Sequence, residues 1–427
     1  MYENKDDLYL ILQPYGSVLY DLNKRKFIIM NNTATKIIED LISGMNAQSI
    51  VQDIVRDGEK VGYDEVEKDV LGVINTLNMF EITTNRIKGA RTLGSKDNLS
   101  IIAAELELTQ ECSFACQYCL VYGSPSGKSG LSKSKWLKIV KTLLNKNLME
   151  ITLTGGDPLN SDSFWPIMEL LQDTEVGISI YTPGIKVDIE FIKKLKELHN
   201  FKNISLQISL DSVDEKINDR YRGIGAYKSA INAIKLLNQN SIPVTIATLI
   251  FPDTINSLEP IFIFGQKYSA KVKVGLVDFI GRATQIKKER IILNEEQKQR
   301  LNLEYAKMQH KYGSSFNDII ELKQLNESEL ENFEYMSNLE YKKCPTSYGI
   351  IDINFDGLIK PCSLPKEYFE KLDKDFMINP KDISTEISNI GKSNFYNKIS
   401  KISVKQDSSI NKWGGCTLYE YYLGLKQ

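Results

Sequence analysis

The spacing of apolar residues divides the chain into a short N-terminal unit and a longer region of alternating strands and helices. In residues 1–85, three strand-like runs, at 8–12, 17–21 and 26–30, precede three stretches with helical spacing. A short polar turn around Asn23 joins the second and third runs, as in a hairpin. The helical stretches place apolar residues three or four positions apart, at Ala34, Ile37, Ile38, Leu41 and Ile42, at Ile50, Val51, Ile54 and Val55, and at Val66, Val70, Val73, Leu77 and Phe80. This order predicts a small winged-helix-like α+β domain over residues 1–85.

The region after residue 100 has the pattern of a parallel sheet with crossover helices. Residues 86–99 are polar and contain two glycines, so we interpret them as a linker. The expected strands cover 101–107, 150–154, 176–181, 204–209, 244–250 and 272–279, with helical stretches such as 133–144 and 226–237 between them. Alternation of this kind implies parallel strands. Six units predict a partial (β/α)6 barrel over residues 100–295, and the less regular residues 296–427 form a separate C-terminal domain.

The composition is that of an ordinary globular protein. Of the 427 residues, 42% are hydrophobic and 25% are charged, which is enough apolar material for more than one core. The net charge of −2 gives no basic excess of the kind that nucleic-acid-binding proteins carry. No run of about 18 apolar residues indicates a membrane span, and the acidic N-terminus lacks a signal-peptide layout. We therefore expect no nucleic-acid or membrane partner and, by default, a cytoplasmic location.

Three of the six cysteines lie together just after the first strand of the barrel region. Cys112, Cys116 and Cys119 have a C-x-x-x-C-x-x-C spacing, which lets one loop place three thiolates around a single cluster. A 4Fe–4S cluster takes four ligands, so three cysteines leave one iron open for a small chelating ligand such as the amino and carboxylate groups of methionine. A structural zinc site is the alternative, although zinc sites more often use paired C-x-x-C knuckles. The two histidines, His199 and His310, fit structural roles.

The cysteine spacing, with Tyr118 directly before the third cysteine, resembles the hallmark motif of the radical S-adenosylmethionine (radical SAM) superfamily. The resemblance implies a 4Fe–4S cluster on Cys112, Cys116 and Cys119 and a bound S-adenosylmethionine with Tyr118 beside it. It also implies an electron donor such as flavodoxin or ferredoxin, and cleavage of the cofactor to a 5′-deoxyadenosyl radical. The fold class is then α/β, a partial (β/α)6 barrel of the radical SAM type.

The end of the second barrel strand matches a cofactor-binding position of this superfamily. Thr154, Gly155, Gly156 and Asp157 resemble the GGE motif that binds the methionine amino group, with Asp where Glu is commoner. Glycines allow close backbone approach, and Asp157 adds a carboxylate for an ammonium group. A tight strand-to-helix turn is the alternative.

Three further residues are similar to cofactor contacts of the superfamily. Thr182 stands in Thr-Pro-Gly where relatives often have Thr-Asn-Gly, so only the threonine is carried over. Ser209 ends the fourth strand, and the resemblance implies contact with the ribose or the methionine end. Arg222 offers a guanidinium fork that suits a carboxylate, or alternatively forms a surface salt bridge. Gly281-Arg282-Ala283, after the sixth strand, is also similar to a family motif, with no role assigned.

The remaining cysteines, Cys344, Cys362 and Cys416, indicate a second metal site. An Asp-Gly pair, ending at Gly357, lies between apolar runs and predicts a hairpin that brings Cys344 and Cys362 together. The C-x12-G-x4-C spacing resembles the SPASM or twitch domains of radical SAM enzymes, here over residues 296–427. Full SPASM domains hold seven cysteines, so three imply one auxiliary iron–sulfur cluster, with 4Fe–4S favoured and 2Fe–2S open. Three unrelated buried cysteines are the alternative.

The N-terminal unit resembles the RiPP recognition element, the leader-binding domain of ribosomal-peptide maturases. A leader peptide can add as a further strand to an exposed sheet edge. Residues 10–32, together with the C-x12-G-x4-C hairpin, most resemble the thioether-forming sactisynthases. The implied partner is a ribosomally made precursor peptide with a leader, in which a substrate cysteine thiolate closes a thioether on a carbon. Alternatives are a carbon–carbon crosslinking or epimerising maturase, a generic winged-helix interaction domain, and a non-catalytic iron–sulfur binding or sensing protein.

Overall fold

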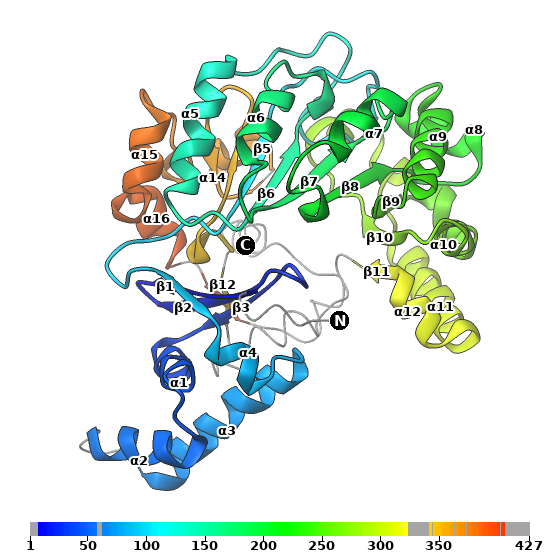
Figure 1. Ribbon diagram of the computed structural model, residues 1–427. Helices are drawn as coiled ribbons and strands as arrows, with labels where there is room; N and C mark the ends of the chain where they lie inside the picture. The colour runs from blue at the N-terminus through cyan, green and yellow to red at the C-terminus, as the bar shows by residue number, and fades with distance from the viewer. Residues whose placement is uncertain are drawn as a thin grey trace.

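The chain folds into a small N-terminal domain and a larger, curved α/β sheet (Figure 1). The computed structural model describes residues 7–57, 62–322, 341–343, 345–362, 364–372, 374–401 and 403–405. The N-terminal domain, blue in Figure 1, lies across one end of the larger sheet. Among the described residues, no helix has the length and apolar character needed to span a membrane.

The N-terminal domain contains one four-stranded sheet with helices on one side. The strands, in the spatial order β3-β2-β1-β4, are β1 (Leu8–Gln13), β2 (Gly16–Asp21), β3 (Lys26–Met30) and β4 (Arg91–Gly94). The helices are α1 (Asn32–Ile42), α2 (Ala47–Asp57), α3 (Tyr63–Met79) and α4 (Thr84–Lys88). The first three strands pair antiparallel, and β4 runs parallel to β1. The three predicted strands and three predicted helices are confirmed, and α4 and β4 are additional.

Strand β4 lies in the segment predicted to be a linker, and that prediction is wrong for residues 91–94. These residues pair with β1 from Tyr9 opposite Arg91 to Leu12 opposite Gly94. Their side chains are mostly exposed because β4 is the outer strand of the sheet. An exposed edge strand needs few apolar residues, which is why the polar composition of the segment gave no strand signal.

Side chains of a strand alternate between its two sides, and in the N-terminal sheet both sides are buried. One set packs with the domain's own helices, and includes Leu8, Leu10, Leu19, Ile28 and Met30. The opposite set packs against the barrel, and includes Tyr9, Ile11, Val18, Tyr20 and Ile29, together with Ile102. At its outer end, Gln13 exchanges two hydrogen bonds with the backbone of Ser100, at 2.9 and 3.3 Å. The N-terminal domain is therefore docked on the barrel through an apolar face.

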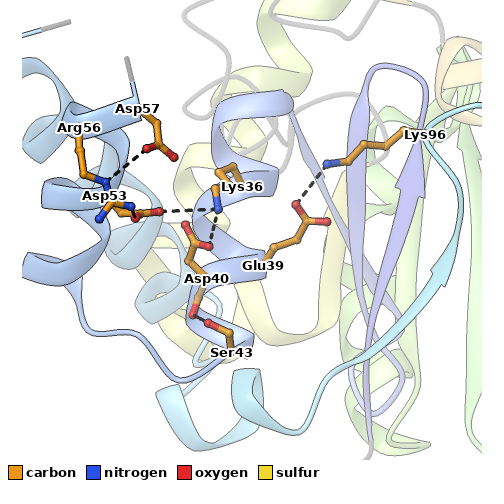
Figure 2. Close-up of polar contacts among 8 residues, drawn as sticks. All are labelled: Lys36, Glu39, Asp40, Ser43, Asp53, Arg56, Asp57 and Lys96. Carbon is orange, nitrogen blue, oxygen red and sulfur yellow. Dashed lines mark hydrogen bonds and ion pairs between the residues drawn. The ribbon is translucent and has the colours of Figure 1, made fainter. Parts of the chain in front are cut away.

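The helices on the far side of this domain are joined by charged side chains (Figure 2). Lys36 on α1 pairs with Asp40 at 2.8 Å and reaches Asp53 on α2 at 4.0 Å. Lys96, which follows β4, pairs with Glu39 on α1 at 3.2 Å. Exposed pairs of this kind contribute about 0–1 kcal/mol each, so the apolar contacts dominate the stability of the domain.

The larger sheet contains nine strands in the order β11-β10-β9-β8-β7-β6-β5-β13-β14. Its six central strands are parallel: β5 (Ala103–Glu107), β6 (Glu150–Thr154), β7 (Gly177–Thr182), β8 (Ile204–Ser209), β9 (Val244–Ile250) and β10 (Lys271–Leu276). The helices that follow these strands are α5 (Lys133–Leu144), α6 (Phe164–Leu171), α7 (Ile189–Lys196), α8 (Glu215–Arg222), α9 (Ala226–Gln239), α10 (Leu258–Lys267), α11 (Glu295–Tyr312) and α12 (Ser314–Ile319). The predicted partial (β/α)6 barrel is confirmed, with short strand β11 (Ile320–Leu322) added at one edge.

The two faces of the barrel strands differ in polarity. Positions such as Ile151, Leu153 and Ile178 point to the helices and belong to the main apolar core. Alternate positions, such as Thr152 and Ser179, are half-buried and point to the concave side. The concave side is therefore polar along these strands, and the strand ends on that side can present functional groups.

The C-terminal region continues the barrel sheet at its first strand. The predicted hairpin is confirmed as β13 (Ile350–Ile353) and β14 (Ile359–Lys360), and β13 pairs parallel with β5, which the sequence did not predict. Other strands and α-helices among the described residues of this region are β12 (Tyr341–Lys343), β15 (Ser403–Lys405), α14 (Lys366–Leu372), α15 (Ile383–Asn389) and α16 (Asn394–Ile399). Helix α15 packs beside α5 in Figure 1. Cys344 and Cys416 lie outside the described residues.

Arg25 joins the N-terminal domain to the amino-terminal ends of the barrel strands. It lies in the β2–β3 turn with φ 52°, a left-handed conformation that non-glycine residues adopt only at a cost. Its guanidinium pairs with Glu150 at the start of β6, through Nε to Oε1 at 2.8 Å and a second contact to Oε2. It also donates to Ser205 on β8 at 3.0 Å and to Ser179 on β7 at 3.3 Å. One side chain therefore bridges three barrel strands.

We expect replacement of Arg25 to weaken the docking of the N-terminal domain. Arg25→Gly removes the contacts but suits the positive φ, and should lower the free energy of unfolding by about 2 kcal/mol because Glu150 loses its charged partner. Arg25→Ala should cost about 1 kcal/mol more, since alanine is disfavoured in the left-handed region. Urea unfolding of the metal-free chain measures both. Lys24→Ala, in the same turn but on an exposed ion pair with Glu81, is the control. Equal stability of all three variants would contradict the docking role.

Candidate active site

The cysteine loop begins just after β5 and is closed by its own backbone. The N–H of Cys112 donates to the carbonyl of Ser124 at 3.0 Å, and the N–H of Cys119 donates to the carbonyl of Cys116 at 3.2 Å. Gly123 donates its N–H to the Sγ of Cys119 at 3.2 Å. Cys112 is buried, and Cys116 and Cys119 are half-buried. The three predicted cysteines therefore lie on one short loop at the carboxyl end of the first barrel strand.

The Gly155-Gly156 turn after β6 packs directly on the residues that lead into this loop. The N–H of Gly156 donates to the carbonyl of Thr109 at 2.6 Å, and that of Asp157 donates to the carbonyl of Glu111 at 2.8 Å. A Cβ atom on Gly156 would lie 2.4 Å from the carbonyl oxygen of Glu111, so only glycine permits this approach. The glycines thus serve the chain's own packing, beside the ligand contact that the sequence predicts for them.

Asp157 is fully buried and incompletely paired. Its Oδ1 accepts hydrogen bonds from the hydroxyl of Thr182 at 2.9 Å and from the N–H of Leu159 at 3.2 Å. Its Oδ2 has no hydrogen-bond partner among the described residues. Burial raises the pKa of Asp157 to about 6, while these two hydrogen bonds act in the opposite direction. A buried carboxylate oxygen without a partner is a place for a cationic or hydrogen-bonding ligand.

Arg222 lies in a buried ion pair that sequence reasoning missed. It donates to Oδ1 of Asp211 at 2.7 Å, and the two side chains are 8% and 0% exposed, so the alternative of a surface salt bridge is wrong. The other oxygen of Asp211 accepts the hydroxyl of Tyr118, whose ring lies 5.4 Å from the guanidinium carbon of Arg222. Asp211 also accepts the N–H of Leu249 at 3.0 Å. The network fixes Tyr118, and with it the middle of the cysteine loop. The signal available in the sequence was an aspartate shortly after the end of a strand.

Arg282 is a second residue whose role the sequence left open. Its guanidinium donates to the carbonyl of Cys116 at 2.8 Å and to that of Gly123 at 2.9 Å. Its backbone N–H donates to the carbonyl of Cys119 at 3.0 Å. Gly281 has φ 59°, and a Cβ there would lie 2.7 Å from the same Cys119 carbonyl. The motif after the last barrel strand therefore grips the cysteine loop.

The other predicted site residues are placed with fewer contacts. Thr154 and Ser209 end β6 and β8, and both are half-buried on the concave side. Cys362 is half-buried and packs against the main core beyond β14. Because Cys344 and Cys416 lie outside the described residues, the predicted auxiliary site stays a prediction.

A buried charged group links the C-terminal hairpin to the start of the cysteine loop. Lys360 on β14 pairs with Glu107, the last residue of β5, at 2.6 Å, and with Asp352 on β13 at 3.0 Å. All three side chains are almost completely buried. Burial raises the pKa of both carboxyl groups, and their two charges hold the pKa of Lys360 above its ordinary value. The pairs tie β13 and β14 to the strand that carries the loop.

Burial favours the neutral thiol at two of the three cysteines in the metal-free chain. Burial raises the pKa of Cys112 to about 12 and that of Cys116 to about 11. Arg222 and Arg282 act against the shift at Cys116, so positive charge is already placed where thiolates would form. Metal ligation displaces such protons, and three thiols on one loop are the donors that an iron–sulfur cluster requires. Among the described residues, no three His, Cys, Asp or Glu side chains are gathered closely enough to hold a single metal ion.

The sequence and the fold both match known proteins. Residues 106–264 match the Radical SAM superfamily. This segment is a radical SAM domain. Across the chain, the sequence is 25% identical over 363 residues to the sporulation killing factor maturation protein SkfB of Bacillus subtilis (strain 168), covering 84% of this chain and 83% of SkfB. It is 24% identical over 360 residues to the antilisterial bacteriocin subtilosin biosynthesis protein AlbA of the same strain, covering 82% of this chain and 73% of AlbA.

The fold around the radical SAM domain also has a solved counterpart. The crystal structure of Streptococcus suis SuiB bound to precursor peptide SuiA matches with a TM-score of 0.64 at 14% identity, covering 96% of this chain and 92% of that one. At this identity the likeness concerns the fold. The resemblance to sactisynthases predicted from the sequence is confirmed by SkfB and AlbA, because both similarities extend well beyond the radical SAM domain.

The buried Asp157 should make the stability of the metal-free chain pH-dependent. Its pKa is about 6 in the fold and 3.8 as its ordinary value. The folded chain therefore loses stability relative to the unfolded chain as pH rises from about 4 to 6, by up to about 3 kcal/mol, and the difference stays constant above that. Asp157→Asn should stabilise the metal-free chain at pH 7.5 and match the wild type near pH 4.

Urea unfolding of the metal-free chain at the two pH values measures this effect. Asp162→Asn, an exposed position in the same connection, is the control and should change stability by less than about 0.5 kcal/mol. A wild type as stable as Asp157→Asn at pH 7.5 would contradict the burial of a charged carboxylate.

Proposed function

We propose that this chain is a radical SAM maturase of a ribosomally made peptide, and that it installs thioether crosslinks between a cysteine and a carbon of the peptide. The similarity to SkfB over 84% of the chain carries this proposal, because a match of this length must reach into both the N-terminal and the C-terminal regions as well as the barrel. The thioether is inferred from that relationship and from AlbA. The docked N-terminal domain and the polar concave side of the barrel supply a peptide-binding element and a reaction chamber in one body.

Cys112, Cys116 and Cys119 would hold the 4Fe–4S cluster, and its fourth iron would be left for S-adenosylmethionine. The free Oδ2 of Asp157 is suited to the ammonium group of the methionine moiety, since it is buried and lacks a partner. Thr182 holds this carboxylate in place through Oδ1. When bound, the cluster and S-adenosylmethionine would supply the radical chemistry that removes a hydrogen atom from the peptide.

The other predicted contacts line the same edge of the sheet. Thr154, Gly155 and Gly156 border Asp157, and Ser209 ends β8, from where it would meet the ribose or methionine end. Arg222 acts through the chain itself: its pairing with Asp211 holds Tyr118 and the loop, while its Nε, which has no partner among the described residues, is the part left for a ligand.

The leader of the precursor peptide would pair with β3 of the N-terminal domain. β3 ends the sheet, and on its outer side the described residues supply no strand. Backbone groups there can accept an added strand. The β2–β3 turn carries Arg25, which bridges three barrel strands, so a leader on β3 would be held at a fixed place relative to the barrel.

The C-terminal region would hold one auxiliary cluster, most simply 4Fe–4S, on Cys344, Cys362 and Cys416. Thioether formation removes two hydrogens from the peptide, so the electron left after hydrogen abstraction needs an acceptor, and the auxiliary cluster would be that acceptor. A flavodoxin or ferredoxin would reduce the first cluster. The buried pairs of Lys360 connect this region to β5, which favours a fixed spacing between the two metal sites.

Conversion of a precursor peptide by the reconstituted enzyme tests the function. With iron, sulfide, a reductant and S-adenosylmethionine, the wild type should form 5′-deoxyadenosine and a peptide that has lost two hydrogens for each crosslink. Cys112, Cys116 and Cys119 changed together to Ala should abolish both and lower the iron content by about four atoms. Mass spectrometry and chromatography measure these products, and a peptide without its leader should react at least about tenfold more slowly.

The products also separate the proposed reaction from its alternatives. A thioether removes one free thiol for each two-hydrogen loss, which alkylation of the peptide detects. An unchanged thiol count with the same mass loss identifies a carbon–carbon crosslink, and an unchanged mass with altered chirality identifies an epimer. If the triple cysteine variant formed as much 5′-deoxyadenosine as the wild type, the cluster assignment would be overturned.

We expect the auxiliary site to be separable from the radical SAM site. Cys344, Cys362 and Cys416 changed together to Ala should lower the iron content by about four atoms if the cluster is 4Fe–4S. The first cluster should remain, because its ligands lie in the radical SAM domain and these three cysteines lie outside it. 5′-Deoxyadenosine should still form, but thioether product should not. Iron analysis and peptide mass spectrometry measure the outcome. Normal thioether formation by this variant would contradict an electron-accepting auxiliary cluster.

A further inference from the structure

One residue, Arg282, satisfies three carbonyls of the cysteine loop. The acceptors belong to Cys116, Cys119 and Gly123, and the distances are 2.8, 3.0 and 2.9 Å. The first two are cysteines of the cluster motif, and the third closes the loop. Three bonds from one residue to a segment of eight residues (116–123) leave that segment little freedom to change its shape.

The contact at Gly123 also bears on a hydrogen bond to a cysteine sulfur. At Gly123 the carbonyl faces Arg282, while the N–H donates to the Sγ of Cys119 at 3.2 Å. Hydrogen bonds to cysteine sulfur are among the factors that set the reduction potential of an iron–sulfur cluster. The grip of Arg282 on the carbonyl side therefore helps to hold the N–H side against a ligand sulfur.

The charge of Arg282 is not consumed by a carboxylate. Two other arginines, Arg220 at the surface and the buried Arg222, pair with Asp253 and Asp211, at 2.5 and 2.7 Å. Within the described part of the chain, no Asp or Glu lies within ion-pair distance of Arg282. A guanidinium is always charged, so a full positive charge stands beside the loop.

The backbone is shaped for this contact. Gly281 has φ 59°, and a Cβ atom there would lie 2.7 Å from the Cys119 carbonyl and 2.9 Å from the Cα of Leu120. A side chain at position 281 would therefore clash with the loop, and glycine there lets the backbone of Arg282 approach the loop closely. A lysine at 282 would keep the charge but has no planar fork to span two carbonyls.

We propose that Arg282 is a positioning residue that locks the cysteine loop around the first cluster and, through its unpaired charge, favours the cluster's reduced form. The proposal rests on the cluster assigned under the proposed function. It has two parts. The guanidinium fork holds the cysteine loop and thereby helps the site to retain iron, and the positive charge raises the reduction potential of the cluster. Positive charge near a cluster stabilises the more negative, reduced state.

Three variants of the full chain separate these parts. Arg282→Lys keeps the charge and loses the fork, and Arg282→Gln loses both. Arg220→Gln is the control, because its side chain pairs with Asp253 at the surface and contacts no loop carbonyl through its guanidinium in the described structure. Each reconstituted variant is challenged with an iron chelator, and its reduction potential is measured by redox titration of the electron paramagnetic resonance signal that changes when S-adenosylmethionine is added.

We expect both Arg282 variants to lose iron at least about tenfold faster than Arg220→Gln, as is usual when a residue supporting metal ligands is removed. Only Arg282→Gln should show a clearly more negative potential. Thermal unfolding of the metal-free variants shows whether each is folded, and Arg282→Lys keeps the test valid if Arg282→Gln is not. Iron retention equal to the control would overturn the locking role, and equal potentials for Lys and Gln would overturn the charge role. A wild type with no signal responsive to S-adenosylmethionine would instead overturn the cluster assignment itself.

Discussion

The site depends on one constraint, the contact of the cysteine loop's backbone with two neighbouring backbones. The turn at Gly156 comes within hydrogen-bond distance of the segment before Cys112, and the backbone at Gly281 and Arg282 comes within hydrogen-bond distance of Cys119. Neither contact leaves room for a Cβ atom. Gly156 follows β6 almost directly and Gly281 follows β10 after a short connection, so the barrel sheet sets where both backbones meet the loop. Asp157 and Arg282 directly follow these glycines: the N–H of Asp157 donates to the carbonyl of Glu111, and the guanidinium of Arg282 donates to the carbonyls of Cys116 and Gly123.

Much of this architecture could be predicted from the sequence, because it rests on local patterns. Strands and helices alternate with clear periods, three cysteines have a diagnostic spacing, and an Asp-Gly pair marks the hairpin. What failed depends on contacts between distant segments. Strand β4 is an exposed edge strand of polar residues, and the pairing of β13 with β5 joins residues almost 250 positions apart by an even backbone ladder that side chains do not encode. The pairing of Arg222 with Asp211 was also not predicted, because nothing in their spacing along the chain indicates that the two side chains meet in the interior.

The position of the N-terminal domain changes how leader binding and chemistry can be related. A domain on a flexible linker would concentrate the precursor near the barrel without setting its path. Here the sheet buries apolar side chains against the barrel, and Arg25 reaches the starts of three barrel strands. A leader paired with β3 would therefore leave the domain from a fixed point. The length of peptide between the leader and the reacting residue then limits which residues can enter the barrel from the other end.

The distribution of charge across the site suits the two groups proposed to bind there. On one side, Asp157 is a buried carboxylate with a free oxygen, in a setting that disfavours its charge unless a cation joins it. On the other, Arg282 is a cation without a carboxylate partner among the described residues, beside thiols that would carry negative charge when ligating iron. Arg222 and Asp211 neutralise each other and hold Tyr118. The metal-free site is thus left with an anion and a cation that are each incompletely compensated. The ammonium group of one ligand would compensate Asp157, and an anionic cluster would compensate Arg282. Binding of the ligand and the cluster together should therefore stabilise the fold more than binding of either one alone.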